Sequence, residues 1–250
     1  GCDHIGHGRS SVKKDYGYFG EKNGWSYLIK NTKKLTHYMK KEYPDIPYFI
    51  YGHGMGSLIV RMECIHEKNI NGIILSGTMG KQKYCRRNLL FAALLKRIQG
   101  AAHRSTYLQK NMEKHLNRHF FKEHDIYSWV AVAKEARKEY SRIYSEHIPI
   151  TVAAYEDILK MLALVSTKKW YHSVNVDIPI MLIGGREDPI GNFGKGVEEV
   201  HRRLEDSCHR VELHLYDKMR HNICDEERRN DVYTDILQWM KLYINEPDEF

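Results

Sequence analysis

The 250-residue chain has no long apolar run, few cysteines and no dense block of one charge. No stretch approaches the roughly 18 consecutive apolar residues that span a bilayer, and the first residues do not have the pattern of a signal peptide. The five cysteines are an odd number without C-x-x-C spacing, which argues against a disulfide framework and a zinc site. They suit a reducing compartment, so we expect a cytoplasmic protein.

The positive charges are scattered along the chain. Lysine and arginine total 39 against 32 acidic residues, a net charge of +7, yet no basic run reaches five residues. This excess permits attraction to anionic membranes or ligands. Because no nucleic-acid-binding module is recognisable, we expect no nucleic-acid partner.

Strand-like and helix-like segments alternate in both halves of the chain, which is typical of a parallel sheet covered by helices. The helical spacing of apolar residues predicts helices over 25–41, 55–67 and about 226–243. Short apolar strands are expected to begin at Pro47, Gly72, Pro179 and Val211. The last helix has one apolar stripe, made of Val232, Ile236, Trp239, Met240 and Tyr243.

The segment 86–170 differs, because it shows only helical periodicity, including the stretch "SWVAVAKEARKEYSRIY". No low-complexity linker separates it from its surroundings, so it indicates an inserted helical cap rather than a separate domain. We therefore predict an α/β fold with a mostly parallel sheet. Its core spans 1–85 and 171–250, and its cap spans 86–170.

The stretch "YGHGMGS" at 51–57 lies between a predicted strand and a predicted helix. This is the setting of a G-x-S-x-G nucleophile elbow, a turn that presents a serine, but Gly54 stands where the serine would be. A glycine-rich turn without a chemical role is one alternative. A dinucleotide fingerprint is another, but Ser57 or Ile59 stands where its third glycine belongs.

Two later residues match the rest of a hydrolytic triad in chain order, nucleophile, acid and base. Asp188 follows the predicted strand at Pro179, and His221 follows the strand at Val211. At the end of a strand a carboxylate is well placed to orient an imidazole. Each residue alone has an ordinary explanation, a turn former or one of 15 histidines, but their joint placement favours an active site.

The sequence resembles the α/β-hydrolase group of monoacylglycerol lipases and bacterial lysophospholipases, the serine aminopeptidase-like hydrolases. The match rests on "DHIGHGRSS" from Asp3, the turn at 52–56, "GGREDPIG" from Gly184 and "RHNICDEERRNDVYTDILQWM" from Arg220. "NRHFFKEHDIYSWVAV" from Asn117 is similar to the family's cap. In the family, the first stretch follows initial strands and a loop that donates half of the oxyanion hole, so we expect those strands to be absent from this chain.

The resemblance implies a carboxylic ester hydrolase with its nucleophile at position 54, His221 as general base and Asp188 as its partner. The backbone N–H of Met55 is expected to supply an oxyanion donor. No cofactor or metal is expected. Because Gly54 has no hydroxyl, catalysis should be impaired in this chain. Gly54 fits both an introduced replacement of serine and a naturally inactive relative.

An apolar pattern at 89–98, with basic residues at its ends, favours either a lid over an acyl chain or membrane, or a helix packed on the core. The pattern consists of Leu89, Leu90, Phe91, Leu94, Leu95 and Ile98, and the basic residues are Arg86, Arg87, Lys96 and Arg97. We expect a small-molecule or monoacyl lipid ester substrate, with peripheral membrane contact through the cap as an alternative location. An aminopeptidase, using an acidic group among Glu135, Glu139, Glu146 and Glu156, and a non-catalytic lipid-binding protein remain open.

Overall fold

The computed structural model describes residues 1–65, 70–143 and 150–244. Its described part contains a four-stranded parallel sheet in the order β1-β2-β3-β4. The strands are β1 (Phe49–His53), β2 (Gly72–Ser76), β3 (Ile180–Gly185) and β4 (Val211–Tyr216), as the sequence predicts. β2 and β3 are buried along their whole length, because they are central strands covered on both faces.

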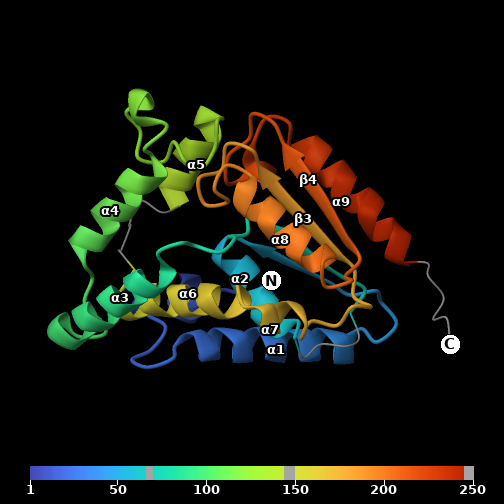
Figure 1. Cartoon of the computed structure of the whole chain (residues 1–250), viewed down its shortest axis with the longest axis horizontal. Helices are drawn as coiled ribbons and strands as arrows, with labels where there is room; N and C mark the ends of the chain where they lie inside the picture. The colour runs from blue at the N-terminus through green and yellow to red at the C-terminus, as the bar shows by residue number, and fades with distance from the viewer. Residues whose placement is uncertain (66–69, 144–149, 245–250) are drawn as a thin grey trace.

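Helices cover both faces of this sheet (Figure 1). Apolar residues of α1 (Trp25–Glu42), α2 (Met55–Glu63), α6 (Val152–Val165) and α8 (Lys195–Glu205) form the main core with one face. On the other face, Val232 and Trp239 of α9 (Arg229–Ile244) pack with Ile74 and Met181. Ile236, Met240 and Tyr243 join this second cluster, which confirms the predicted apolar stripe.

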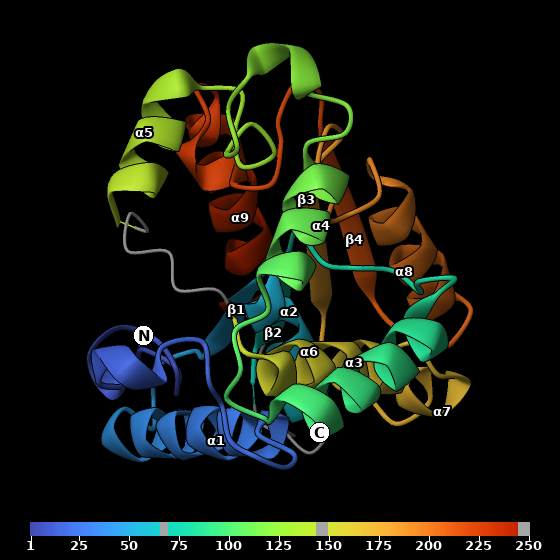
Figure 2. The ribbon, with the colours of Figure 1, turned by 90° about the vertical axis from the view of Figure 1, so that its left-hand side faces the viewer.

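The remaining helices are α3 (Cys85–Gln99), α4 (Thr106–Leu116), α5 (Lys134–Ile143) and the short α7 (Lys168–Tyr171). Figures 1 and 2 show α4 and α5 on the side of the molecule toward which β3 and β4 point, and α3 lower, beside α6. α6 packs against α3 as well as against α1 and α2. The division into a core and a cap at 86–170 remains a prediction. No helix among the described residues is long and apolar enough to cross a membrane.

One helical expectation is wrong. Residues 128–133 of "SWVAVAKEARKEYSRIY" lie outside any helix, in a turn and a bend, and α5 begins only at Lys134. Tertiary hydrogen bonds replace the helical ones here: the amides of Val132 and Ala133 donate to the Glu226 carboxylate, and the carbonyl of Val130 accepts from the amide of Asn222. These contacts hold the segment against the loop that follows β4.

Candidate active site

The carboxyl ends of all four strands lie at one edge of the sheet. The register pairs His53 with Ser76, and Gly185 with Tyr216, so β1 ends level with β2 and β3 ends level with β4. Residues far apart in sequence are therefore brought together in the loops beyond this edge. Those loops carry both predicted triad partners and the glycine turn.

The turn at Gly54 has the backbone shape of a nucleophile elbow. Gly54 has φ 55° and ψ −116° between β1 and α2, and its amide donates to the Ser76 carbonyl at 3.0 Å. Gly52 permits close packing of strand and helix, because a β-carbon there would lie 2.7 Å from both the Gly56 carbonyl oxygen and Val60 Cγ2. The positive φ at 54 is readily adopted by glycine and strained for other residues.

The two predicted partners are in direct contact. His221 Nδ1–H donates to Asp188 Oδ2 at 2.9 Å, and the other carboxylate oxygen, Oδ1, accepts from the Ile190 amide at 2.8 Å. Asp188 is only 1% exposed. With Nδ1 protonated and bound to a carboxylate, Nε2 is the free, basic nitrogen of the His221 ring.

Position 54 faces that nitrogen. A β-carbon built on Gly54 would lie 3.0 Å from His221 Nε2 and 3.4 Å from His221 Cε1. A side chain there would therefore point at the imidazole, after the ring or the turn shifted by a few tenths of an ångström. Met55 is the first residue of α2, and the first amides of a helix have no intrahelical acceptor.

Gly77, at the end of β2, provides room for the imidazole. It has φ 57°, and a β-carbon there would lie 2.9 Å from His221 Cε1, 3.0 Å from its Nδ1 and 3.4 Å from Asp188 Oδ2. Any side chain at 77 would therefore displace the His221–Asp188 pair. Its proximity to the pair depends on tertiary structure, so sequence reasoning did not single it out.

Two other potential nucleophiles lie away from this arrangement. Ser57 is fully buried, and its hydroxyl contacts the Gly54 carbonyl at 2.6 Å and the Thr78 hydroxyl at 2.9 Å. Cys64 belongs to the main core, and burial raises the pKa of its thiol to about 12. Neither side chain is a reactive substitute for a residue at 54.

The loop that carries His221 is anchored through the residues on both sides of the histidine. Arg220 donates to both carboxylate oxygens of Glu123 and to the Ser128 carbonyl at 2.6 Å, and its guanidinium lies 3.8 Å above the Phe120 ring. Hydrogen bonds from Arg220 lower the pKa of Glu123 to about 2. The segment 120–133 is thus fastened to the His221 loop.

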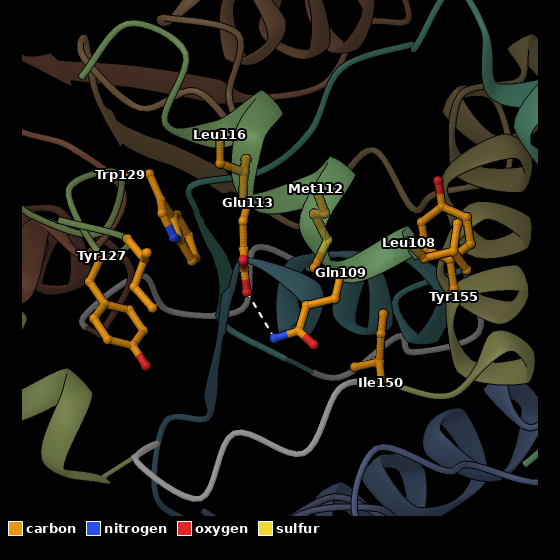
Figure 3. A pocket seen from close by; sticks show the side chains of 10 residues that line it. Leu108, Gln109, Met112, Glu113, Leu116, Tyr127, Trp129, Ile150 and Tyr155 are labelled. Carbon is orange, nitrogen blue, oxygen red and sulfur yellow. Dashed lines mark hydrogen bonds between the residues drawn. The ribbon is translucent and has the colours of Figure 1, made fainter. Parts of the chain in front are cut away.

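Trp129 of this segment also contacts the histidine. Its ring centroid is 5.4 Å from that of His221, and the ring also lines an apolar cavity of about 110 Å³. Figure 3 shows Leu116, Met112 and Leu108 of α4 along one side of this cavity, with Tyr127, Ile150 and Tyr155 around it. Its lining also includes the polar residues Gln109 and Glu113, and the Gln109 amide donates to the Glu113 carboxylate at 2.8 Å.

Comparison with known proteins identifies the family. The chain matches the family described as serine aminopeptidase, S33, over residues 1–228. It belongs to this family of α/β-hydrolases. A "Monoglyceride lipase homolog" of Monkeypox virus is 30% identical to this S33 chain over 99 residues, which are 37% of the chain and 33% of that relative. The match thus spans about a third of the viral protein's length.

Solved structures agree with the S33 assignment at the level of the fold. A thermostable carboxyl esterase of Bacillus coagulans in complex with glycerol has a TM-score of 0.87 at 24% identity, covering 97% of this chain and 79% of that one. A structure titled "Lipase (Open form)" has a TM-score of 0.86 at 25% identity, covering 98% of this chain and 80% of that one. A soluble variant of monoglyceride lipase from Saccharomyces cerevisiae, in complex with a substrate analogue, has a TM-score of 0.66 at 20% identity. The match covers 98% of this chain and 77% of that one.

Proposed function

We propose that this site is that of a carboxylic ester hydrolase, with the nucleophile position at Gly54, His221 as general base and then acid, and Asp188 orienting His221. The Met55 amide is the proposed oxyanion donor. The observation that carries the proposal is the direction of position 54: its β-carbon would lie 3.0 Å from the free nitrogen of a histidine that is itself held by a buried carboxylate.

With glycine at position 54, this chain is proposed to be catalytically impaired. Acyl transfer needs an alkoxide, which His221 would create by removing a proton, and Gly54 has no hydroxyl to deprotonate. His221 retains the ability to activate a water. Triad enzymes that lose one member keep only about 10³ to 10⁴-fold catalysis over water. We therefore expect a residual rate and prolonged binding of intact ester.

The proposed substrates are monoacyl lipids such as monoacylglycerols or lysophospholipids. The apolar cavity beside Trp129 supports an acyl group directed away from His221. Its volume of about 110 Å³ is close to that of a dry engineered cavity that binds benzene, about 150 Å³, so in this conformation it suits a short acyl segment. The names of the viral relative and of the yeast structure, both monoglyceride lipases, support the same class.

We further propose that α3 contacts a lipid surface. Leu90 is 75% exposed, Ile98 is 71% exposed and Leu94 is 55% exposed, whereas Ala92 on the opposite side of the helix is buried. The exposed arginines 86, 87 and 97 lie on the same side as these apolar residues by helical spacing. Lys96, in contrast, faces inward and pairs with Glu156. An apolar face flanked by cations suits an anionic membrane surface.

An aminopeptidase is the second function that an observation favours. Glu135 and Glu139 line a cavity of about 600 Å³ together with Asn222, the neighbour of His221, and Asp225. Such acids suit the ammonium group of a peptide. Of the four candidate acids, Glu139 already pairs with Arg142, Glu156 is engaged by Lys96 and Lys160, and Glu146 lies outside the described residues.

The test of the proposed function is restoration of the nucleophile. We expect Gly54→Ser in the full-length chain to raise turnover of chromogenic esters by at least about 10³-fold over the Gly54 protein, which is the scale of a triad member's contribution. A series of acyl lengths should favour short chains. Aminoacyl anilides test the peptidase alternative in the same assay.

Gly54→Ser combined with His221→Ala is the matched control and should return to the Gly54 rate. A fluorophosphonate probe should label the restored serine. If the restored protein folds but turns over neither substrate and ignores the probe, the ester hydrolase proposal is wrong. Binding of intact lipid by that inactive protein would instead support a non-catalytic lipid-binding role.

A further inference from the structure

His53, the residue before Gly54, sits at the centre of a hydrogen-bonded chain beside the His221–Asp188 pair. Its Nδ1 lies 3.1 Å from Ser76 Oγ at the end of β2, and its Nε2 lies 3.1 Å from Asn222 Oδ1. Its ring centroid is 4.4 Å from that of His221. One partly buried ring thus contacts the end of one strand, the loop after another and the histidine itself.

The hydrogen bonds determine which nitrogen of His53 carries the proton. Asn222 Nδ2 donates to Asp225 Oδ2 at 3.1 Å, and since a carboxylate only accepts, the amide of Asn222 must point its NH₂ group that way. Its oxygen therefore faces His53. An amide oxygen only accepts, so His53 Nε2 is protonated and donates to it.

The other nitrogen is then unprotonated at neutral pH. Burial, with a smaller contribution from the neighbouring His221, lowers the pKa of His53 to about 4, while Asn222 and Asp188 act in the opposite direction. Nδ1 accepts a hydrogen bond from the Ser76 hydroxyl. The ring is neutral, which matters because a cation at 4.4 Å would oppose protonation of His221 during general base catalysis.

We propose that His53 is a positioning residue: its neutral, Nε2-protonated ring links Ser76 to Asn222 and so holds the His221 ring facing position 54. Asn222 directly follows His221, and the backbone N–H of Asn222 donates to the Val130 carbonyl. Rotation of the His221 loop away from the turn would break the His53–Asn222 bond and leave a partly buried donor without this partner. This inference rests on the proposed function for its catalytic consequence, but its structural content is testable without catalysis.

The first test uses the Gly54 protein with ¹⁵N-labelled histidine and long-range ¹H–¹⁵N NMR spectra. One imidazole, lost in His53→Leu, should show protonated Nε2 and unprotonated Nδ1 without titrating between about pH 5 and pH 9, unlike an ordinary histidine. His53→Leu should also shift the His221 resonances. His37→Leu, which changes an exposed histidine on α1, is the matched control and should leave them unchanged.

The second test measures kinetics in the Gly54→Ser background. We expect His53→Leu to lower kcat by about 10 to 100-fold with little change in KM, because a displaced general base costs rate rather than binding. His53→Gln, whose amide can still donate toward Asn222, should recover most of this loss. If only the volume of the ring mattered, His53→Leu would instead keep a higher kcat than His53→Gln.

The two proposals fail in different ways. If Gly54→Ser is inactive while the NMR tautomer and the His221 shift are as described, the ester hydrolase proposal falls and the positioning of His221 by His53 stands. A His53 ring that titrates near its ordinary value, or that carries its proton on Nδ1, overturns the positioning proposal. The positioning proposal is also overturned if His53→Leu leaves both the His221 resonances and kcat unchanged.

Discussion

At the scale of single residues, two glycines set the space around the His221 ring. Gly54 and Gly77 both have positive φ, and both lie within about 3 Å of His221 when a β-carbon is added. They differ in what they permit. A side chain at 54 would point at the basic nitrogen, whereas a side chain at 77 would enter the space of the ring. Glycine therefore occupies the proposed nucleophile position in one case, and in the other it leaves the space that the His221 ring fills.

We predict that Gly77→Ala disrupts the site as well as the turn. The left-handed backbone alone costs an alanine about 1–2 kcal/mol, and the contact with the His221 ring adds to that cost. Urea unfolding of the Gly77→Ala protein should therefore show a lower midpoint. Adding Gly77→Ala to the Gly54→Ser protein should abolish its activity. Gly100→Ala is the control for activity: φ 87° and ψ 158° there also strain an alanine, but nothing lies within 4 Å of the added carbon. Equal loss of activity in both variants would contradict the steric explanation.

At the scale of elements, the segment 120–133 is fastened to the His221 loop, whereas α3 exposes one side to solvent. The segment is tied to the His221 loop by Arg220, Glu226 and Asn222, each through hydrogen bonds to a different position. α3 packs on α6 and leaves its apolar side outward. We infer that the wall of the site beside Trp129 is held in place while α3 is available to a surface.

We predict that α3 binds vesicles that contain anionic phospholipid. Leu94→Glu should weaken binding by at least about tenfold, because it removes apolar burial and adds a charge repelled by the anionic surface. Co-sedimentation with phosphatidylserine-containing vesicles, compared with pure phosphatidylcholine, measures this. Leu237→Glu, at an exposed position of α9 with 56% exposure against 55% for Leu94, is the matched control. Equal binding by the two variants would rule out α3 as the contact.

At the scale of the whole molecule, buried ionisable groups link stability to pH. Asp157 of α6 is buried against Gly24 at the start of α1, and its Oδ2 has no hydrogen-bond partner among the described residues. Burial raises the pKa of this carboxyl to about 6. The folded state therefore binds the proton more tightly than the unfolded chain does. Ionisation of Asp157 destabilises the fold as the pH rises through about 4 to 6.

We predict that Asp157→Asn stabilises the protein at alkaline pH and not in acid. The neutral amide avoids burying a charge, so the free energy of unfolding at about pH 8 should rise by about 1–3 kcal/mol, and the gain should vanish near pH 4. Urea unfolding at both pH values measures the difference. Asp45→Asn, at an exposed position, should change neither value. A gain that is independent of pH would refute the ionisation of Asp157 as its cause.

Much of the architecture was predictable because it depends on local pattern. Period-3.6 apolar spacing marked α1, α2 and α9, and short apolar runs marked the four strands. The exposed side of α3 was less predictable. An apolar helix face is usually buried, and the sequence alone left open whether this one packs on the core. Likewise, 128–133 has helical spacing, but its amides bind Glu226 instead.

The sequence by itself determined the order of the site: a glycine turn after one strand, an aspartate after a second and a histidine after a third. It also determined that Gly54 lacks the hydroxyl, because that is a property of the residue and not of its surroundings. Only the tertiary structure decided that position 54 faces Nε2, that Gly77 makes room for the ring and that His53 bridges Ser76 and Asn222. These are contacts between loops that meet because parallel strands end at one edge of a sheet, and no local pattern encodes such meetings.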